Sequence, residues 1–369
     1  MTAGFFSPLP PARTGVADYS AALLAELKKR LDVRLDSRGC DVALYHLGNN
    51  AYHAKIYREA LERPGVVVLH DASLHHFLLG SLSRAEYVAE FVYNYGEWSG
   101  SLAEDLWRNR ARSAADPRYF EYGMLRRVAA RALAVIVHNP GAAAAVSAHA
   151  PEANVVEIPH LVTTAPPPGA VDVLRTREAL GVGADTTLFG VFGHLRESKR
   201  LSVVLHAFEA VRRESRAALL VAGEFASPDL ERALGPALDR AGVLRAGFTP
   251  EAEFRLLAAA VDACVNLRYP GAGETSGIAM RLMAAGKPVI VTRGAETSRF
   301  PETACLRVDS GPAEQEMLAA WMRWLCADPP SGREIGRRAA AWVARHHSPE
   351  RAAGLYASVL ESARSAIIK

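Results

Sequence analysis

The sequence is poor in cysteine and has no cysteines at close spacing. Its four cysteines are spread over the 369 residues: Cys40, Cys264, Cys305 and Cys326. Small disulfide-stapled domains have a high density of cysteine, and zinc sites draw their ligands from short spacings such as Cys-x-x-Cys. The sequence therefore indicates neither, and we expect Cys264, which lies in an apolar stretch, to be a buried free thiol.

Long apolar runs and a strong charge imbalance are also missing. The sequence has no run of about 18 apolar residues, which a membrane-spanning helix needs, and Met1–Ala12 lacks the features of a signal peptide. We therefore expect a cytoplasmic protein. The 43 basic and 40 acidic residues leave a formal charge of +3. This mildly favours anionic small molecules or a membrane surface as partners and gives no support for nucleic-acid binding.

Several catalytic motifs are absent as well. No Gly-x-Ser-x-Gly, His-Glu-x-x-His, Gly-Lys-Ser/Thr phosphate loop or Gly-x-Gly-x-x-Gly loop follows a predicted strand. Hydrolysis by a serine nucleophile, ATP-driven chemistry and nicotinamide redox chemistry are therefore disfavoured. His75 and His76 have no further ligands at a suitable spacing, so we expect them to be structural and expect no metal or other cofactor.

Seven arginines gather in one stretch of the first half. They are Arg108, Arg110, Arg112, Arg118, Arg126, Arg127 and Arg131. Two interpretations stay open: a solvated helical face, or a contact with an anionic acceptor or with lipid headgroups at the inner membrane face.

Short apolar segments alternate with amphipathic ones along the whole chain. The predicted strands are Phe5–Ser7, Val42–Leu47, Val66–His70, Ala134–Val137, Val155–Ile158, Thr187–Phe192, Ala218–Ala222, Val261–Leu267 and Val289–Thr292. The predicted helices are Val16–Leu31, Leu201–Glu214, Ala252–Ala260 and Ile278–Ala285. Repeated strand–helix–strand units predict an α/β fold with two doubly wound, Rossmann-like parallel sheets that face each other across a cleft.

The stretch Ala165–Gly169, with three consecutive prolines, predicts a linker between the first and second halves of the chain. We therefore place an N-terminal domain at residues 1–165 and a C-terminal domain at 166–347. The last helix, at about 348–369, is expected to pack back on the first domain.

Two basic residues follow the strand Thr187–Phe192, at the point where ligands bind in such sheets. The guanidinium of Arg196 can donate two hydrogen bonds to phosphate oxygens, and Lys199 adds a compact positive charge. The pair would therefore neutralise a diphosphate. A solvated basic loop is the alternative.

A glycine-rich turn precedes the helix Ile278–Ala285 and carries one carboxylate, Glu274, and the hydroxyls of Thr275 and Ser276. A helix start offers unpaired N–H groups and a partial positive charge, which suit a phosphate. The turn therefore predicts a site for a nucleotide diphosphate, with a carboxylate beside it for a hydroxyl-rich group.

Polar residues also follow three strands of the first half, which predicts a pocket for hydroxyl groups. They are His46, Gly48, Asn49 and Asn50, then His70 and Asp71, then His138 and Asn139. The pair His70-Asp71 has the most reactive character, although a histidine bonded to a local backbone carbonyl would look the same. The loop that ends in Arg13, Thr14 and Gly15 either permits close approach of a ligand or is an ordinary turn.

Taken together, these motifs resemble those of retaining glycosyltransferases of family 4, which have the GT-B fold. The resemblance covers nearly the whole chain and rests on the order and spacing of several segments. These are Pro10-Pro11, Thr14–Ser20, Leu69-His70-Asp71, Phe192-Gly193 with Arg196 and Lys199-Arg200, Gly247-Phe248, Gly273–Gly277 and Ala285–Ile290.

The resemblance implies a metal-independent, retaining transfer of a sugar from a nucleotide-diphosphate sugar to an acceptor hydroxyl. The acceptor would be a glycan, a lipid-linked molecule or a small molecule. The implied catalytic residues are His70, Asp71, Arg196, Lys199 and Glu274. The implied donor-binding residues are Gly15, Gly193, His194, Arg196, Lys199, Arg245, Phe248, Glu274, Thr275, Ser276, Gly277, Ile278 and Arg281. The acceptor-binding residues are expected to be Arg13, Thr14, His46, Asn49, Asn50, His138 and Asn139.

The chain departs from the family pattern at two positions. Arg281 stands where the family has a second glutamate for the ribose hydroxyls, and guanidinium cannot accept those hydrogens. His194 stands where many members have arginine, a role that Arg196 would take over. Two other functions stay open: a nucleotide-sugar epimerase of the same architecture, and a non-catalytic nucleotide- or glycan-binding protein.

Overall fold

The computed structural model describes residues 1–12 and 14–368, and Arg13, one of the predicted acceptor-binding residues, lies outside them. The chain forms two compact units. Unit 1 comprises Met1–Thr163, Pro270–Thr275 and His346–Lys369, and unit 2 comprises Thr164–Tyr269 and Ser276–Arg345.

Unit 1 is built on a parallel sheet with the strand order β2-β1-β3-β4-β5-β6. The strands are β1 (Thr2–Phe6), β2 (Asp32–Leu35), β3 (Val42–Leu47), β4 (Val66–Leu69), β5 (Ala134–Val137) and β6 (Val155–Glu157). Strands β3, β4 and β5 are buried along their whole length. This agrees with their continuous apolar sequences, because a parallel sheet is covered on both faces.

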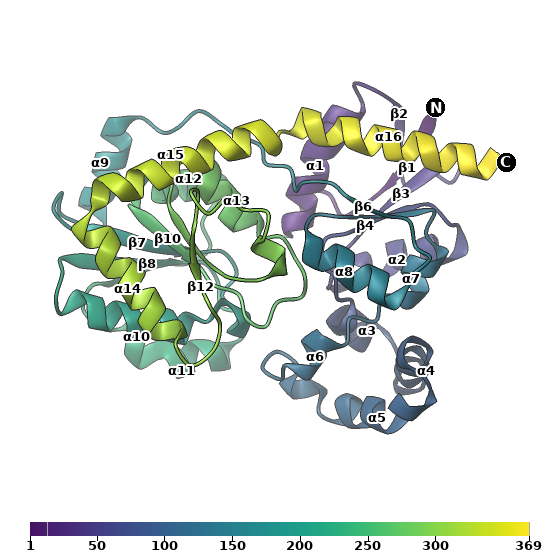
Figure 1. Cartoon of the computed structure of the whole chain (residues 1–369), viewed down its shortest axis with the longest axis horizontal. Helices are drawn as coiled ribbons and strands as arrows, with labels where there is room; N and C mark the ends of the chain where they lie inside the picture. The colour runs from purple at the N-terminus through teal and green to yellow at the C-terminus, as the bar shows by residue number, and fades with distance from the viewer. Residues whose placement is uncertain (13, 369) are drawn as a thin grey trace. The chain divides into compact units, whose positions relative to one another are not determined.

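Helices cover both faces of this sheet, and alternate residues of each strand point to opposite cores. On one face, Leu44 and Val68 pack with residues of α1 (Gly15–Leu27) and α16 (Pro349–Ile368). On the other face, Tyr45 and Val67 pack with residues of the remaining helices. These are α2 (Ala54–Glu62), α3 (His75–Ser81), α4 (Arg84–Tyr95), α5 (Gly100–Arg108), α6 (Arg118–Glu121), α7 (Arg126–Arg131) and α8 (Pro140–His149). Figure 1 shows α16 lying along α1, and α3 to α6 as a cluster of their own below the sheet.

Unit 2 has a second parallel sheet, ordered β12-β11-β10-β7-β8-β9. Its strands are β7 (Thr187–Phe192), β8 (Ala217–Ala222), β9 (Val243–Ala246), β10 (Ala263–Asn266), β11 (Val289–Thr292) and β12 (Leu306–Val308). Its helices are α9 (Ala170–Ala179), α10 (Leu201–Arg212), α11 (Pro228–Leu238), α12 (Glu251–Ala260), α13 (Gly277–Ala284), α14 (Glu314–Ala327) and α15 (Pro329–His346). Short 3-10 turns are η1 (Ala51–His53), η2 (Glu97–Ser99), η3 (Arg110–Arg112), η4 (Glu197–Lys199) and η5 (Ala295–Thr297). One hydrophobic core of this unit lies between the sheet, α10 and α14.

The predicted fold class, two doubly wound parallel sheets with flanking helices, is confirmed. Some element ends differ from the prediction for local reasons. The predicted strand Val261–Leu267 begins only at Ala263, because the Val261 N–H still bonds to Leu257 O at the end of α12. Strands β2, β9 and β12, all at sheet edges, were not predicted. Three of the four residues of β2 are exposed, β9 is only partly buried, and β12 has three residues, so none of them has a long apolar run.

The described residues include no helix that is both long enough and apolar enough to cross a bilayer.

Candidate functional site

Two glycines bring the loop after β7 close to its neighbours. Gly193 follows β7 with a positive φ of 89°, and a Cβ there would lie 3.0 Å from Ile278 Cγ1. Gly223 follows β8, and a Cβ there would lie 2.1 Å from Gly193 O. Side chains at these positions would strain the backbone or push the loop away. The loop that carries Arg196 and Lys199 is therefore packed directly against the first turn of α13.

Lys199 lies under this loop and is only 3% exposed. Its Nζ donates to Phe192 O at 2.7 Å, and it lies 3.5 Å from Asn266 Oδ1. Its charged group is therefore held where the carboxyl ends of β7 and β10 meet. The Lys199 side chain is therefore buried, whereas the alternative interpretation of the sequence expected it to be solvated.

Arg196 and His194 are exposed on the same loop. Burial of part of the ring, and then the positive charge of Arg196, lower the pKa of His194 below its ordinary value. The carboxylate of Glu224 acts in the opposite direction on this pKa, and Lys199 adds a smaller lowering effect. The loop after β7 therefore presents a local positive potential, with a histidine that stays neutral at pH 7.

Helix α13 begins beside this loop and is capped by Ser276. Its Oγ accepts a hydrogen bond from Ala279 N at 3.2 Å, and Asn266 Nδ2 donates to the same oxygen at 3.1 Å. The guanidinium of Arg268 lies 3.5 Å from this hydroxyl. Asn266 therefore links the capped helix start to Lys199, and both lie at the carboxyl edge of the second sheet.

Glu274 and Thr275 belong to unit 1, because the segment Pro270–Thr275 packs there. Asn139 Nδ2 donates to Gly273 O at 2.9 Å and to Thr275 Oγ1 at 3.0 Å. Gly273 has a positive φ of 72°, and a Cβ there would lie 2.5 Å from Ala72 Cβ. Glu274 itself folds back so that Oε2 accepts from Ala272 N at 2.8 Å. The turn is thus tightly held, and only glycine fits at position 273.

Four histidines gather at the carboxyl edge of the first sheet, each from the end of a different strand. They are His46, His70, His138 and His160. Their common neighbour is Tyr19 on α1, whose ring centroid lies 4.8 Å from those of His70 and His160. The Tyr19 hydroxyl lies 2.9 Å from that of Tyr356 on α16.

These histidines are neutral at pH 7. Burial lowers the pKa of His46 and of His70 well below the ordinary value. Burial likewise lowers the pKa of His138 to about 4 and that of His160 to about 3. His46 Nδ1 lies 3.0 Å from His70 Nε2, so His70 bonds to a second histidine rather than to a backbone carbonyl. The next residue, Asp71, accepts a hydrogen bond from Asn49 N at 2.8 Å.

Most of the predicted acceptor-binding side chains have partners inside the protein. Thr14 and Asn50 cap α1 and η1, and Asn139 Oδ1 caps α8 by accepting from Ala142 N at 2.8 Å. Asn49 Oδ1 accepts from Phe77 N at 2.8 Å, and His138 Nδ1 donates to Ile158 O at 2.9 Å. These side chains therefore have a structural role, whether or not a ligand also contacts them.

Gly15, by contrast, faces open space. It is the first residue of α1, and a Cβ built there would meet no described heavy atom within 4 Å. The protein does not itself need a glycine for packing at this position, so the space is available to a ligand.

Three further predicted donor-binding residues, Arg245, Phe248 and Arg281, belong to unit 2. Arg245 on β9 pairs with Glu231, and Phe248 in the loop after β9 is 56% exposed. Arg281 pairs with Glu251 at 2.5 Å, and its guanidinium lies 3.9 Å from the ring centroid of Phe254. Arg281 thus has the salt bridge that would account for it without a ligand.

The sequence interpretation missed four residues that the structure brings into these clusters: Tyr19, His160, Asn266 and Arg268. Asn266 and His160 had a usable signal, since each is a polar residue at or just after the end of a short strand. Tyr19 fits the apolar stripe of α1 equally well, so its role as the centre of the histidine cluster is invisible in the pattern.

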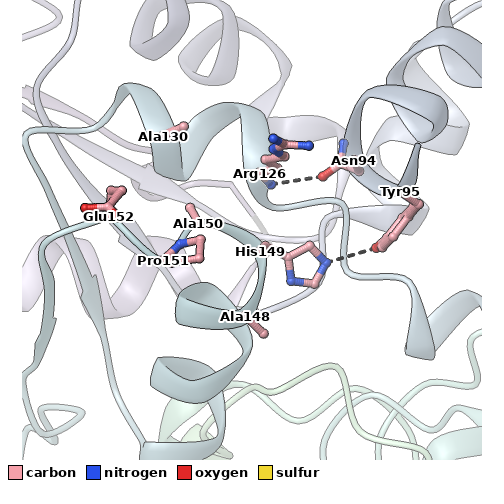
Figure 2. A pocket seen from close by; sticks show the side chains of 9 residues that line it. All are labelled: Asn94, Tyr95, Arg126, Ala130, Ala148, His149, Ala150, Pro151 and Glu152. Atoms are coloured by element: carbon pink, nitrogen blue, oxygen red, sulfur yellow. Dashed lines mark hydrogen bonds between the residues drawn. The ribbon is translucent and has the colours of Figure 1, made fainter. Parts of the chain in front are cut away.

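A separate pocket of about 530 Å³ lies at the far end of α8 (Figure 2). Its lining residues are Asn94, Tyr95, Arg126, Ala130, Ala148, His149, Ala150, Pro151 and Glu152. Tyr95 Oη lies 3.0 Å from His149 Nε2, and Arg126 N donates to Asn94 Oδ1 at 2.9 Å. Helix α8 begins at Pro140, beside Asn139, and ends at His149, so this pocket lies away from the site residues.

Within residues 1–12 and 14–368, no group of three or more His, Cys, Asp or Glu side chains has a geometry that could hold a metal ion.

Comparison with known proteins gives one family match. Residues 186–328, which make up most of unit 2, match the family model described as "Glycosyl transferases group 1". No curated protein matches the sequence of the chain.

Solved structures of low sequence identity share the fold over the whole chain. HepE from Anabaena, solved with UDP and glucose, is 15% identical, with a TM-score of 0.68 over 98% of this chain and 100% of its own. Sucrose-phosphate synthase from Thermosynechococcus elongatus is 15% identical, with a TM-score of 0.69 over 99% and 100%. WaaG, a glycosyltransferase of lipopolysaccharide biosynthesis, is 16% identical, with a TM-score of 0.63 over 96% and 99%. At these identities the likeness concerns the fold, which agrees with the predicted GT-B-like architecture.

Proposed function

We propose that this protein is a retaining glycosyltransferase of family 4 that moves a sugar from a nucleotide-diphosphate sugar to an acceptor hydroxyl without a metal ion. The family match over residues 186–328 and the fold shared with HepE, a protein that binds UDP, support this proposal. The observation that carries it is the placement of Lys199. Its ammonium group is buried at the carboxyl edge of the second sheet, joined through Asn266 to the capped start of α13.

The proposed diphosphate site consists of Lys199, Arg196 and the first turn of α13. Breaking the bond between sugar and diphosphate builds negative charge on the leaving oxygen. Fixed positive groups and backbone N–H groups stabilise that charge without reorganising during the reaction. Gly193 lets the phosphate groups approach the backbone closely, and Gly277 and Ile278 supply the N–H groups of the helix start. Gly15, which faces open space, is proposed to contact the diphosphate as well.

Glu274 is proposed to accept hydrogen bonds from hydroxyls of the donor sugar. One of its carboxylate oxygens accepts a hydrogen bond from Ala272 N at 2.8 Å, which helps to fix the side chain. Thr275 and Ser276 follow it directly and are assigned to the phosphate side. The nucleobase is assigned to the segment from Arg245 to Phe248, where Phe248 offers an exposed ring.

Retention follows if the departing phosphate itself accepts the proton of the acceptor hydroxyl on the same face of the sugar. No protein nucleophile is then needed. His70, kept neutral by burial, would act as a hydrogen-bonding group at the reaction centre rather than as an acid. Asp71, which accepts from Asn49 N, would hold the adjacent backbone in place.

The acceptor is proposed to be a glycan, a lipid-linked molecule or a small molecule, bound in unit 1. A peripheral membrane contact is proposed through the exposed arginines near the end of α5 and in η3. Arg108, Arg110 and Arg112 lie within five residues of one another there and are all exposed. Arg118 is less suited to this role, because it is held by close pairs with Asp105 at 3.0 Å and Asp116 at 2.7 Å, whereas Arg108 lies 3.9 Å from Asp105.

A donor screen tests the proposed function. The purified protein is first screened by thermal shift against nucleoside diphosphates and their sugars, and the stabilising sugar nucleotide is then incubated with candidate acceptors. Release of nucleoside diphosphate together with a heavier acceptor, seen by mass spectrometry, supports the transferase. Conversion of the donor without acceptor would indicate an epimerase. Stabilisation without release under every acceptor would indicate a binding protein, and either result overturns the proposal.

A further inference from the structure

His46 and His70 form a hydrogen-bonded pair of neutral rings within the histidine cluster. His46 Nδ1 lies 3.0 Å from His70 Nε2, and the ring centroids are 5.3 Å apart with an interplanar angle of 21°, so the two rings lie edge to edge. His46 is fully buried on β3, whereas His70 is 9% exposed after β4. The pair therefore runs from the core of the sheet to its carboxyl edge.

A hydrogen bond between two neutral imidazoles has only two arrangements. In one, His46 carries its proton on Nδ1 and donates to His70 Nε2. In the other, His70 carries its proton on Nε2 and donates to His46 Nδ1, which forces the proton of His46 onto its own Nε2. The environment of His46 Nε2 distinguishes the two, because this atom is buried and has no hydrogen-bond partner.

Neighbouring histidines show whether the ring nitrogens without a partner in this core are protonated or unprotonated. His53 Nδ1 lies 2.9 Å from His46 O, and His138 Nδ1 lies 2.9 Å from Ile158 O. A carbonyl oxygen only accepts, so both Nδ1 atoms carry the proton. The unpartnered Nε2 atoms of His53 and His138 are therefore the unprotonated ones. An orphaned, buried N–H is rarer in proteins than an orphaned acceptor, which is consistent with this pattern.

We propose that His46 is a positioning residue that holds His70 in the tautomer with its proton on Nδ1, so that His70 presents an N–H donor to the substrate. His46 donates from Nδ1 to His70 Nε2, and this leaves Nδ1 as the only nitrogen of His70 that can meet a ligand. The edge-on contact with Tyr19, at 4.8 Å between centroids, limits rotation of the His70 ring. The inference deepens the proposed glycosyl transfer, for which this donor would meet a sugar or acceptor oxygen.

The two informative variants are His46→Asn and His46→Phe. The Asn amide places an N–H group near the position of Nδ1, so it keeps the donor and loses the ring. Phe keeps the ring and its contacts with Phe5 and Tyr356, whose centroids lie 4.9 Å and 6.4 Å away, and loses the donor. A purely structural role predicts that Phe is the better substitute. The positioning role predicts the opposite order for activity.

The experiment measures the tautomer of His70 and the steady-state kinetics of each variant. Imidazole ¹⁵N spectra, with His70 assigned by its own substitution, should show Nδ1–H in the wild type and in His46→Asn, and a shift toward Nε2–H in His46→Phe. The kcat of His46→Phe should fall about tenfold or more, the loss of one well-aligned hydrogen bond in the transition state, with the donor KM little changed. His46→Asn should retain most of kcat despite a lower Tm.

A matched control is His75→Phe, which removes a buried histidine bonded to Tyr122 O and Tyr87 Oη outside the site. It should lower Tm without changing kcat or the tautomer of His70. An inactive wild type would overturn the proposed function. An active wild type with Nε2–H on His70, or with equal kcat in His46→Phe, would overturn only this inference.

Discussion

Lys199 Nζ donates a hydrogen bond of 2.7 Å to the carbonyl oxygen of Phe192, the last residue of β7. The two residues are seven positions apart in sequence, and the loop between them carries Gly193, His194 and Arg196. The hydrogen bond closes this loop over the ammonium group. It places a positive charge at the end of a parallel strand, where α/β sheets bind their ligands.

Replacing Lys199 by Met should abolish most of the catalysis while the fold persists. Met fills a similar volume without the charge, so kcat should fall by about 100-fold or more through lost stabilisation of the leaving group. The measurement is nucleoside diphosphate release with the donor found in the screen. The control is Lys287→Met, because Lys287 is partly buried and also donates to backbone carbonyls, Ala259 O and Val261 O. That variant should lose stability and keep kcat; equal losses of kcat in both would contradict the role of Lys199.

Replacing Glu274 by Gln should impair transfer far more than nucleotide binding. Gln can still accept from Ala272 N, so the turn should persist, but a neutral amide accepts sugar hydroxyls more weakly than a carboxylate. We expect kcat/KM to fall by about 10-fold to 100-fold, with the Kd for free nucleoside diphosphate changed less than about threefold. Isothermal calorimetry set beside the transfer rates measures both. A parallel fall in the two quantities would argue against an assignment to the sugar.

Asn139→Asp separates two structural roles of one side chain. The Asp oxygen still caps α8 through Ala142 N, whereas the donor to Gly273 O and Thr275 Oγ1 is lost. Asn139→Ala loses both and should be destabilised by about a further 1 kcal/mol, the usual contribution of an N-cap. Urea denaturation gives the stabilities. If the two variants are equally stable, the cap contributes little; if Asp equals the wild type in both stability and transfer, the bonds to the 273–275 turn are dispensable.

Stability should fall as the pH is lowered from about 6.5 toward about 4. Burial lowers the pKa of His53 and of His138 to about 4, so the unfolded chain takes up protons in this window before the folded protein does. The same sign holds for His160 and His347, whose pKa values burial lowers to about 3 and about 4.

At pH 5 each such histidine should lower the free energy of unfolding by on the order of 2 kcal/mol relative to pH 7. Tyr19, whose ring centroid lies 5.2 Å from that of His138 and 4.8 Å from that of His160, remains neutral here because burial raises its pKa. Denaturation curves at pH 7, 6 and 5 check this, with His138→Asn expected to show a shallower dependence. A free energy of unfolding that stays level between pH 7 and 5 would show that the cluster is hydrated and protonates freely.

Local sequence patterns predicted nine of the twelve strands that the structure describes, together with the strand-end loops. Buried parallel strands have continuous apolar sequences, so Val42–Leu47, Ala134–Val137, Thr187–Phe192 and Val289–Thr292 were predicted with the bounds that the structure has. Lys199 and Ser276 were placed at strand-end or helix-start positions for the same reason. The edge strands β2, β9 and β12 were missed because short or partly exposed edge strands need no long apolar run.

The partners of the site residues depend on contacts between distant parts of the chain. Asn139 was read as a ligand-binding residue, yet its amide meets Gly273, 134 residues away. His46 and His70 are 24 residues apart and become a hydrogen-bonded pair only because β3 and β4 are neighbours in register. The sequence predicts an ordinary core residue at Tyr19. Only the packing of α1 over the strand ends brings it beside the histidines.

Residue type and spacing therefore specified the sheets, the glycine-dependent turns and the chemical groups at the strand ends, because these follow from backbone sterics and from burial of apolar side chains along short segments. The packing of the chain specified which of those groups pair with one another and which are shielded from water. It also specified which ring nitrogen of each histidine carries the proton. Such properties arise from distances between residues far apart in sequence, and no local pattern encodes those distances.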